Sequence, residues 1–378
     1  MTVTADTLRR ELADTLAHSG KLTDSAWRAA IENTPRELFL GPSFYRGAGT
    51  QWEPVHRDQL GMEEWLRLVY SDTTWVTQVD GIDAAETPGP ASGNPTSSST
   101  LPSLVARMLE LAAIRDGDKV LEIGTGTGYS TAILCHRLGD QRVFSVEYDP
   151  GLAALAAKRI HAAGFTPTLV TGDGLLGHKD SADYDAIVAT CSVRSIPRSW
   201  PYQVREGGSI TTALGGWMMA SGLIRLTVDA DGTASGRFTG DTIGYMLARP
   251  HERPPRGPLF QHPGTTRPTR GNPDIVKSWI GHFLAQLGAP SAELMTTEHS
   301  VILVDVATGS QAWTEPAGGG WTVHQHGPLR LWDQVEDALT AWKEAGKPDQ
   351  SAFGMTVTDN AQTVWLGEPS GPSWQLPA

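Results

Sequence analysis

The chain has 378 residues and a formal net charge of −12 at pH 7, and hydrophobic residues make up 39% of it. The acidic balance argues against a nucleic-acid backbone as the main partner, because phosphates need a basic surface. No stretch approaches the roughly 20 apolar residues of a membrane span, and two cysteines are too few for a disulfide framework. The first residues lack the basic region and apolar core of a secretory signal, so we expect a cytoplasmic protein.

The first hundred residues predict helices, one strand and loops. Thr23 or Asp24 is the expected cap of the second helix. Alternating residues predict a strand over 73–79, whereas residues 41–60 look irregular and residues 80–100 look like a loop. Helical periodicity covers residues 4–18, 23–33 and 62–69.

An apolar run at 119–123 leads into three alternating glycines, and a helix-like stretch at 129–138 follows. Strand, glycine-rich turn and helix is the arrangement with which an α/β sheet holds a nucleoside cofactor. Glycines are needed because the cofactor touches the backbone, which a Cβ would block. The loop reads Gly-x-Gly-x-Gly and places Tyr129 where a dinucleotide site has its last glycine. This spacing favours S-adenosylmethionine over a nicotinamide cofactor.

An acid ends the next predicted strand. Strand 142–147 finishes at Glu147, roughly 20 residues beyond the glycines, where a carboxylate accepts hydrogen bonds from ribose hydroxyls. A third strand, 168–171, is followed by Gly172-Asp173-Gly174. Glu122, just before the glycine loop, has two open roles, which are support of the loop and contact with the cofactor.

Further strands alternate with helices, which predicts a mainly parallel sheet covered on both sides. A fourth strand is expected at 184–190 and a fifth from Gly207, followed by a hairpin of 223–228 with 235–238. One more strand is expected over 241–247. The predicted fold class is therefore α/β, with a Rossmann-like sheet, an N-terminal helical region and a smaller C-terminal α/β domain.

A hydroxyl-rich segment, residues 94–102, runs directly into a strong helix that begins at Pro102. One interpretation is a flexible linker. The other is an anion site, because hydroxyls delivered onto a helix N-terminus can bind a carboxylate. Thr100 fits both interpretations.

The chain beyond residue 250 begins with a proline-rich linker over 249–273 and continues as a smaller α/β region. Its expected helices span 274–287 and 331–345, and its expected strands span 301–306, 321–325, 355–358 and 363–366. His324 and His326 share one face of a strand, but no third ligand is evident, so no metal is expected. The predicted division is a cap region at 1–90, a cofactor-binding domain at 91–250 and an accessory domain at 251–378.

Several motifs occur in an order that resembles protein-L-isoaspartate O-methyltransferases over residues 26–250. The resemblance is carried by Arg36-Glu37-Leu38-Phe39, Val120 to Tyr129, Val146-Glu147, Gly172-Asp173-Gly174, Tyr184 to Thr190, Ile196-Pro197 and Gly207-Gly208. It implies a transferase that methylates a carboxylate of an aspartate-derived residue. It also implies that S-adenosylmethionine is bound by Gly124, Thr125, Gly126, Thr127, Gly128, Glu147, Tyr148, Asp173 and Gly174.

The chain departs from the family pattern in the acceptor segment. Where the family commonly reads Gln-Thr-Ile-Ser-Gln-Pro, this chain reads Ser-Ser-Ser-Thr-Leu-Pro over 97–102. Ser98, Ser99 and Thr100 are the expected catalytic residues, which orient the acceptor carboxylate. The sequence of this segment and the extension after 250 resemble variant methyltransferases that accompany ATP-grasp ligases in the maturation of ribosomal peptides (graspetides).

That resemblance implies an ordinary aspartate in a crosslinked precursor peptide as the acceptor, with an aspartimide or isoaspartate as the product and residues 251–378 recognising the peptide. Three alternatives stay open. One is repair of damaged proteins at isoaspartate, and another is methylation of a small molecule. The last is a scaffold that binds S-adenosylmethionine without turnover.

Overall fold

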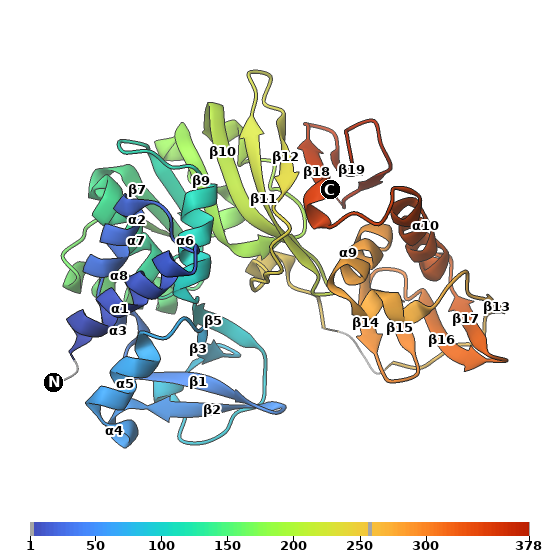
Figure 1. Cartoon of the computed structure of the whole chain (residues 1–378), viewed down its shortest axis with the longest axis horizontal. Helices are drawn as coiled ribbons and strands as arrows, with labels where there is room; N and C mark the ends of the chain where they lie inside the picture. Colours follow the sequence, from blue (N-terminus) through green and yellow to red (C-terminus); the bar gives the residue numbers. More distant parts are fainter. Residues whose placement is uncertain (1–3, 256–258, 378) are drawn as a thin grey trace. The chain divides into compact units, whose positions relative to one another are not determined.

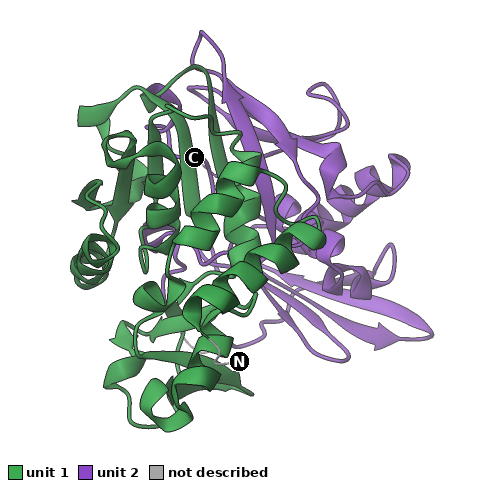
Figure 2. Cartoon of the chain, turned by 60° about the vertical axis from the view of Figure 1, so that its left-hand side comes forward, with its two compact units in different colours: residues 1–190, 203–211 green, residues 191–202, 212–378 purple. Residues whose placement is uncertain are grey.

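The computed structural model describes residues 4–255 and 259–377. Two compact units form, one of residues 1–190 with 203–211 and one of residues 191–202 with 212–378, and Figure 2 colours them green and purple. The chain changes unit within β9 (Tyr184–Val193), again in the turn just before β10 (Val204–Gly215), and once more within β10. The predicted domain boundaries at residues 90 and 250 separate regions by their expected roles, and this division stays a prediction. In the described ranges, no helix combines the length and the apolar character that crossing a membrane requires.

The first unit begins with three helices, α1 (Ala5–His18), α2 (Ser25–Asn33) and α3 (Arg36–Leu40). Asp24 caps α2, because its Oδ1 accepts the amides of Ala26 at 2.7 Å and Trp27 at 3.1 Å. The two helices predicted in this region and the second of the proposed caps are confirmed.

A small sheet follows, and of its strands only the one at 73–79 was predicted. Residues 41–60 contain a hairpin rather than irregular chain, and residues 80–100 contain an ordered strand, β5 (Pro95–Ser99). Because Pro-Thr-Ser-Ser-Ser has no apolar residue, the period-2 signal of a strand is missing; pairing with β3 supplies the order. The other elements are β1 (Ser43–Ala48), β2 (Gln51–His56), α4 (Arg57–Leu60), α5 (Met62–Val69), β3 (Trp75–Val79) and β4 (Ile82–Asp83).

The parallel sheet of the first unit matches the prediction. Its strands lie in the order β9-β6-β7-β8, and each neighbouring pair is parallel. Helix α8 packs against β7 and β8, and α2 packs against α7 (Figure 1). The elements not yet bounded are α6 (Pro102–Leu111), β6 (Val120–Ile123), α7 (Tyr129–Leu138), β7 (Val143–Glu147), α8 (Pro150–Ala162) and β8 (Thr168–Thr171).

The second unit contains an antiparallel set of strands in the order β11-β12-β18-β19-β20. The expectation of a mainly parallel sheet therefore holds only for the first unit. The predicted hairpin of 223–228 with 235–238 and the predicted strands at 355–358 and 363–366 are confirmed, but residues 241–247 form no strand. The strands are β11 (Ser221–Val228), β12 (Ala234–Phe238), β18 (Phe353–Val357), β19 (Gln362–Leu366) and β20 (Ser373–Gln375).

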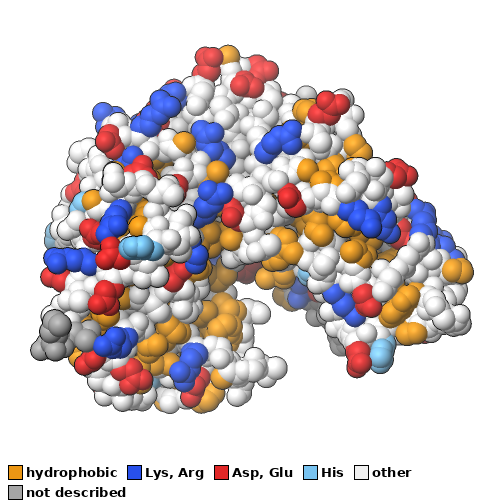
Figure 3. All heavy atoms as spheres, viewed as in Figure 1, with side chains coloured by type: hydrophobic (Ala, Val, Ile, Leu, Met, Phe, Trp, Pro, Cys, Tyr) orange, Lys and Arg blue, Asp and Glu red, His pale blue; other side chains and the backbone are white. Residues whose placement is uncertain are grey.

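A second sheet of this unit has the order β13-β17-β16-β15-β14, with two helices beside it. Trp332 and Trp342 are buried, as expected for one face of the last helix. The first helix begins five residues later than predicted, at Trp279, after a short turn at 273–277. The elements are β13 (Thr265–Pro268), α9 (Trp279–Gly288), β14 (Ala292–Thr296), β15 (Val301–Asp305), β16 (Gln311–Ala317), β17 (Gly320–His326) and α10 (Leu331–Glu344). On the face drawn in Figure 3, basic and acidic side chains are interspersed.

Candidate functional site

The glycine loop between β6 and α7 leaves an open cradle. Gly126 has φ of +55°, a backbone conformation that residues with a Cβ rarely adopt. A Cβ built there meets nothing closer than 3.9 Å, the carbonyl oxygen of Gly124. Gly128 differs, because its φ is +91° and a Cβ would lie 3.0 Å from Ile160 of α8. One glycine therefore frees space for a ligand, and the other allows helix and loop to approach.

Glu147, at the end of β7, holds this loop. The residue is 8% exposed, and Oε2 accepts the amide of Gly126 at 2.8 Å while Oε1 accepts the amide of Asp149 at 3.0 Å. Each carboxylate oxygen keeps a second lone pair for a ligand hydroxyl. Tyr148, the next residue, is half exposed and places a ring beside the same strand end. The arrangement fits a ribose.

The Asp173 segment lies at the same edge of the sheet. Gly174 is so close to the end of β6 that a Cβ on it would lie 2.5 Å from Ile123. The amide of Gly172 donates to the carbonyl of Glu147 at 2.8 Å. Asp173 Oδ1 accepts the amide of Leu175 at 2.9 Å, which caps a short turn. The structure thus brings the glycine loop, Glu147 and the Asp173 segment together, as the parallel sheet predicts.

Glu122 supports the loop. Its side chain is fully buried, Oε2 accepts the hydroxyl of Ser145 at 2.7 Å, and the hydroxyls of Ser130 and Thr131 also donate to it. Ser145 is in turn 2.6 Å from the hydroxyl of Thr125. Of the two roles left open by the sequence, these contacts favour support. Thr125 and Thr127 are both 4% exposed, so their expected contacts with a cofactor would come from the backbone.

Burial raises the pKa of Glu122, although the three donated hydroxyls lower it in part. A raised pKa in the folded state means that folding binds a proton, so stability falls as pH rises above the unfolded value of about 4.5. Glu122→Gln removes the titration. We expect its unfolding free energy, relative to the wild type, to increase as pH rises from 4.5 toward neutrality. Urea melts at several pH values measure this, and a difference that shrinks with rising pH contradicts it.

The predicted acceptor residues lie on β5 and just after it. Ser98 pairs with Val76 and Ser99 with Trp75 on β3. Because side chains alternate along a strand, Ser99 is buried at 1% exposure, whereas Ser98 and Thr100 are half-buried. Within the described chain, neither of the half-buried hydroxyls has a hydrogen-bond partner, and the buried hydroxyl of Ser99 has none either.

Ser98 also adjoins the cofactor cradle. Its carbonyl oxygen lies 4.0 Å from the position that a Cβ of Gly126 would take. The structure therefore brings Ser98 next to the glycine loop. Thr100 lies two residues further along the chain, directly after the end of β5. Ser99, buried at 1% exposure, is less suited to contact a dissolved substrate.

The N-terminus of α6 bears on the second interpretation of residues 94–102, which was an anion site at the start of this helix. Pro102 is at its first position, as predicted. The amide of Ser103 donates to Oδ1 of Asp72 at 2.9 Å, so a carboxylate of this chain already lies at the helix start. The expectation of a substrate carboxylate bound by that helix end is therefore not favoured. No spacing in the sequence indicates Asp72, because the partner comes from a segment 31 residues away.

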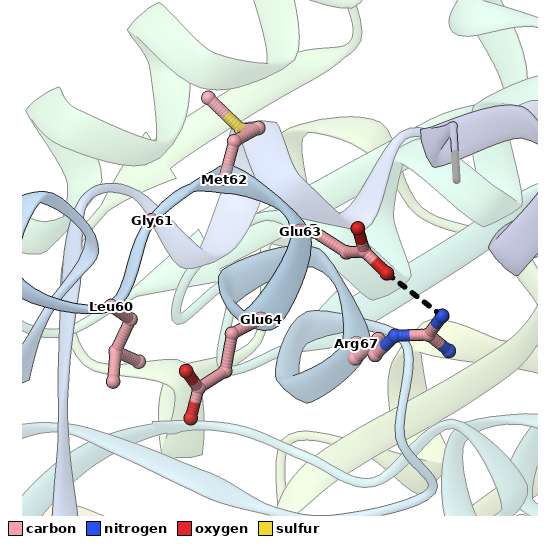
Figure 4. A pocket seen from close by; sticks show the side chains of 6 residues that line it. All are labelled: Leu60, Gly61, Met62, Glu63, Glu64 and Arg67. Atoms are coloured by element: carbon pink, nitrogen blue, oxygen red, sulfur yellow. Dashed lines mark hydrogen bonds and ion pairs between the residues drawn. The ribbon is translucent and has the colours of Figure 1, made fainter. Parts of the chain in front are cut away.

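The described part of the chain also has hollows away from these residues. A cavity of about 410 Å³ at the start of α5 is lined by six residues from Leu60 to Arg67, and Arg67 donates to Glu63 at 3.0 Å across one side (Figure 4). None of the predicted site residues lines it. A second cavity, of about 270 Å³, is in the second unit and is lined by residues 192, 215–216, 219–221 and 244–247.

The two histidines of β17 have ordinary partners. His324 lies 2.9 Å from Glu315 and stacks on Trp313, and His326 lies 2.9 Å from the carbonyl of Pro263. Among the residues that the structure describes, no three His, Cys, Asp or Glu side chains are grouped to hold a metal ion.

Comparison with known proteins identifies the family. Residues 55–234 match the model of "Protein-L-isoaspartate(D-aspartate) O-methyltransferase (PCMT)". The chain is 31% identical to the protein-L-isoaspartate O-methyltransferase of Ignicoccus hospitalis, over 53% of this chain and 78% of that one. It is 33% identical to protein-L-isoaspartate O-methyltransferase 1 of Archaeoglobus fulgidus, over 56% and 81%.

A solved protein-L-isoaspartate O-methyltransferase has the same fold, with a TM-score of 0.56 at 20% identity; the match covers 95% of this chain and all of that one. The predicted fold class is confirmed, and with it S-adenosylmethionine as the cofactor of the fold. The chain belongs to the protein-L-isoaspartate (D-aspartate) O-methyltransferase family.

Proposed function

We propose that the protein transfers the methyl group of S-adenosylmethionine to the free carboxylate of an isoaspartyl residue in a protein or peptide. The family and its relatives support the reaction class. The observation that carries the proposal for this chain is the pair of half-buried hydroxyls, Ser98 and Thr100, that have no hydrogen-bond partner in the described chain. Ser98 lies on β5 beside the glycine loop, and Thr100 directly follows the end of that strand.

In the reaction an acceptor carboxylate oxygen bonds to the methyl carbon, and the carbon–sulfur bond breaks with its electron pair going to sulfur. The acceptor is already ionised at neutral pH, because its unperturbed pKa is about 4. A general base is therefore unnecessary, and alignment supplies most of the rate. Ser98 and Thr100 donate hydrogen bonds that orient the carboxylate, while Glu147 and the backbone of the glycine loop hold the nucleoside.

The product is an activated ester. A neighbouring backbone amide nitrogen attacks it, methanol leaves, and a succinimide ring forms. In repair, water opens that ring toward aspartate. In peptide maturation, the ring persists as an aspartimide or opens to isoaspartate.

A second candidate function is methylation of an ordinary aspartate in a crosslinked precursor peptide. The observation that favours it is the acceptor segment, where residues 97–102 read Ser-Ser-Ser-Thr-Leu-Pro in place of the family's Gln-Thr-Ile-Ser-Gln-Pro. The C-terminal extension does not separate the two candidates, because a solved isoaspartate methyltransferase is matched by 95% of this chain. A role of residues 251–378 in holding the substrate remains part of the proposal.

Four acceptors test the proposal with the full chain and S-adenosylmethionine. They are an isoaspartyl peptide, its aspartyl counterpart, a peptide with an aspartate inside a side-chain ester ring, and the linear form of that peptide. We expect methyl gain by mass spectrometry on the isoaspartyl peptide and not on its aspartyl counterpart. Methylation of the ring peptide alone would replace repair with maturation. Cofactor binding without methylation of any peptide would favour the scaffold or a small-molecule acceptor.

A further inference from the structure

The turn that carries Thr100 is held by a buried arginine from α3. Arg36 is fully buried, and its guanidinium donates to five carbonyl oxygens. Nη1 reaches Val69 at 2.7 Å and Ser71 at 2.9 Å. The bonds of Nη2 are to Thr73 at 2.9 Å, Thr100 at 3.2 Å and Ser99 at 3.3 Å. One side chain thus joins the segment after α5 to the end of β5.

The segment after α5 makes two more contacts with the turn at 99–103. Thr74 Oγ1 accepts the amide of Leu101 at 3.0 Å, and Asp72 Oδ1 accepts the amide of Ser103 at 2.9 Å. Asp72 is fixed in turn by Lys21 at 3.0 Å. The backbone of 99–103 is therefore held at two carbonyls and two amides, while the hydroxyl of Thr100 makes no bond within the described chain.

A buried charge is costly unless hydrogen bonds satisfy it. Burial lowers the pKa of Arg36 to about 10, which still leaves the group charged at neutral pH. Among the described residues no carboxylate forms an ion pair with it, so the five carbonyl dipoles, together with the more distant charge of Asp72, compensate the charge. The arrangement requires the planar fork of arginine, because a lysine ammonium has three donors in a different geometry.

We infer that Arg36 and Thr74 are positioning residues, which act through the backbone of 99–103 to set the direction of the Thr100 hydroxyl toward the acceptor carboxylate. This inference rests on the proposed function. The five carbonyls lie in residues 69–73 and 99–100 and none belongs to the glycine loop, although the guanidinium also lies 5.8 Å from the ring centre of Tyr129 at the start of α7. The turn, and not the hydroxyl alone, then determines alignment.

Thr74→Val is the decisive variant, because Thr74 is exposed and the change is isosteric. Thr73→Val is its matched control, an exposed neighbour whose hydroxyl makes no bond within the described chain. We expect Thr74→Val to lower kcat/KM on the isoaspartyl peptide about 3- to 10-fold, the usual effect of one lost hydrogen bond. Affinity for S-adenosylhomocysteine stays within about 2-fold of the wild type in both variants, well below the effect of one hydrogen bond.

Arg36→Lys keeps the charge and loses at least two of the five bonds, so a larger drop is expected wherever the variant folds. Equal kinetics for Thr74→Val and Thr73→Val would overturn the inference, as would a parallel loss of cofactor affinity. Amide hydrogen exchange of Leu101 is an independent readout, with faster exchange expected in Thr74→Val alone. Unchanged exchange there refutes the contact itself. A wild type that methylates no peptide refutes the proposed function. The exchange result still shows in that case whether Thr74 holds the amide of Leu101.

Discussion

Glu147→Ala is expected to lower the affinity for S-adenosylhomocysteine by about 100-fold or more, as judged from the loss of two charge-assisted hydrogen bonds. The carboxylate accepts the amides of Gly126 and Asp149, so its removal leaves two amides without acceptors. It also removes the lone pairs proposed for the ribose. Titration calorimetry with the full chain measures the loss, and thermal melting shows whether the unit still folds.

Two variants sharpen this result. Glu147→Gln keeps one carbonyl acceptor, so we expect an intermediate loss of about 10-fold, which corresponds to one such bond. Glu206→Ala removes an exposed carboxylate of the same unit and should bind like the wild type. Wild-type affinity in Glu147→Ala would show that the nucleoside lies elsewhere.

Ser98→Ala combined with Thr100→Val should lower kcat/KM on the isoaspartyl peptide by about 100-fold, because two hydrogen bonds to a charged group are lost. Cofactor affinity should stay near that of the wild type, since both side chains lie on the acceptor side. Initial rates over a range of peptide concentrations and calorimetry with S-adenosylhomocysteine separate the two effects. The single variants should each give a smaller loss.

The control for this double variant is Ser92→Ala, which removes an exposed hydroxyl three residues before β5. It should behave like the wild type. Full activity in the double variant would remove these hydroxyls from the reaction. A drop in cofactor affinity of the same size as the drop in rate would instead point to a collapsed glycine loop.

The cofactor half of the site could be predicted because its signals are local. The run from Val120 to Tyr129 contains strand, turn and helix within ten residues, and the structure begins β6 and α7 where the pattern indicates. Glu147 and Asp173 follow because parallel strands end at one edge of a sheet. Glu122 could not be assigned, because its three hydroxyl donors come from two other elements.

The acceptor half was harder to predict because its order comes from pairing across the chain. β5 has no apolar residue, and only its register with β3 makes Ser99 buried and Ser98 half-buried. The partner of the α6 start, Asp72, and the five acceptors of Arg36 are likewise remote in sequence. Propensity and periodicity do not report contacts of this kind.

The pairing of β12 with β18 has a consequence for how the polypeptide is made. Arg237 and Ala352, a bonded pair beside these strands, are 115 residues apart in the chain. On the ribosome, β12 therefore waits with an open hydrogen-bonding edge until the last strands emerge, and unpaired edges recruit other chains. Expression of a fragment ending near residue 250 would make that waiting state permanent. Such a fragment would keep the orphaned edge of β12 and would also uncover Phe238, which packs on Phe283 in the full chain, so we expect it to aggregate although its cofactor-binding unit is intact.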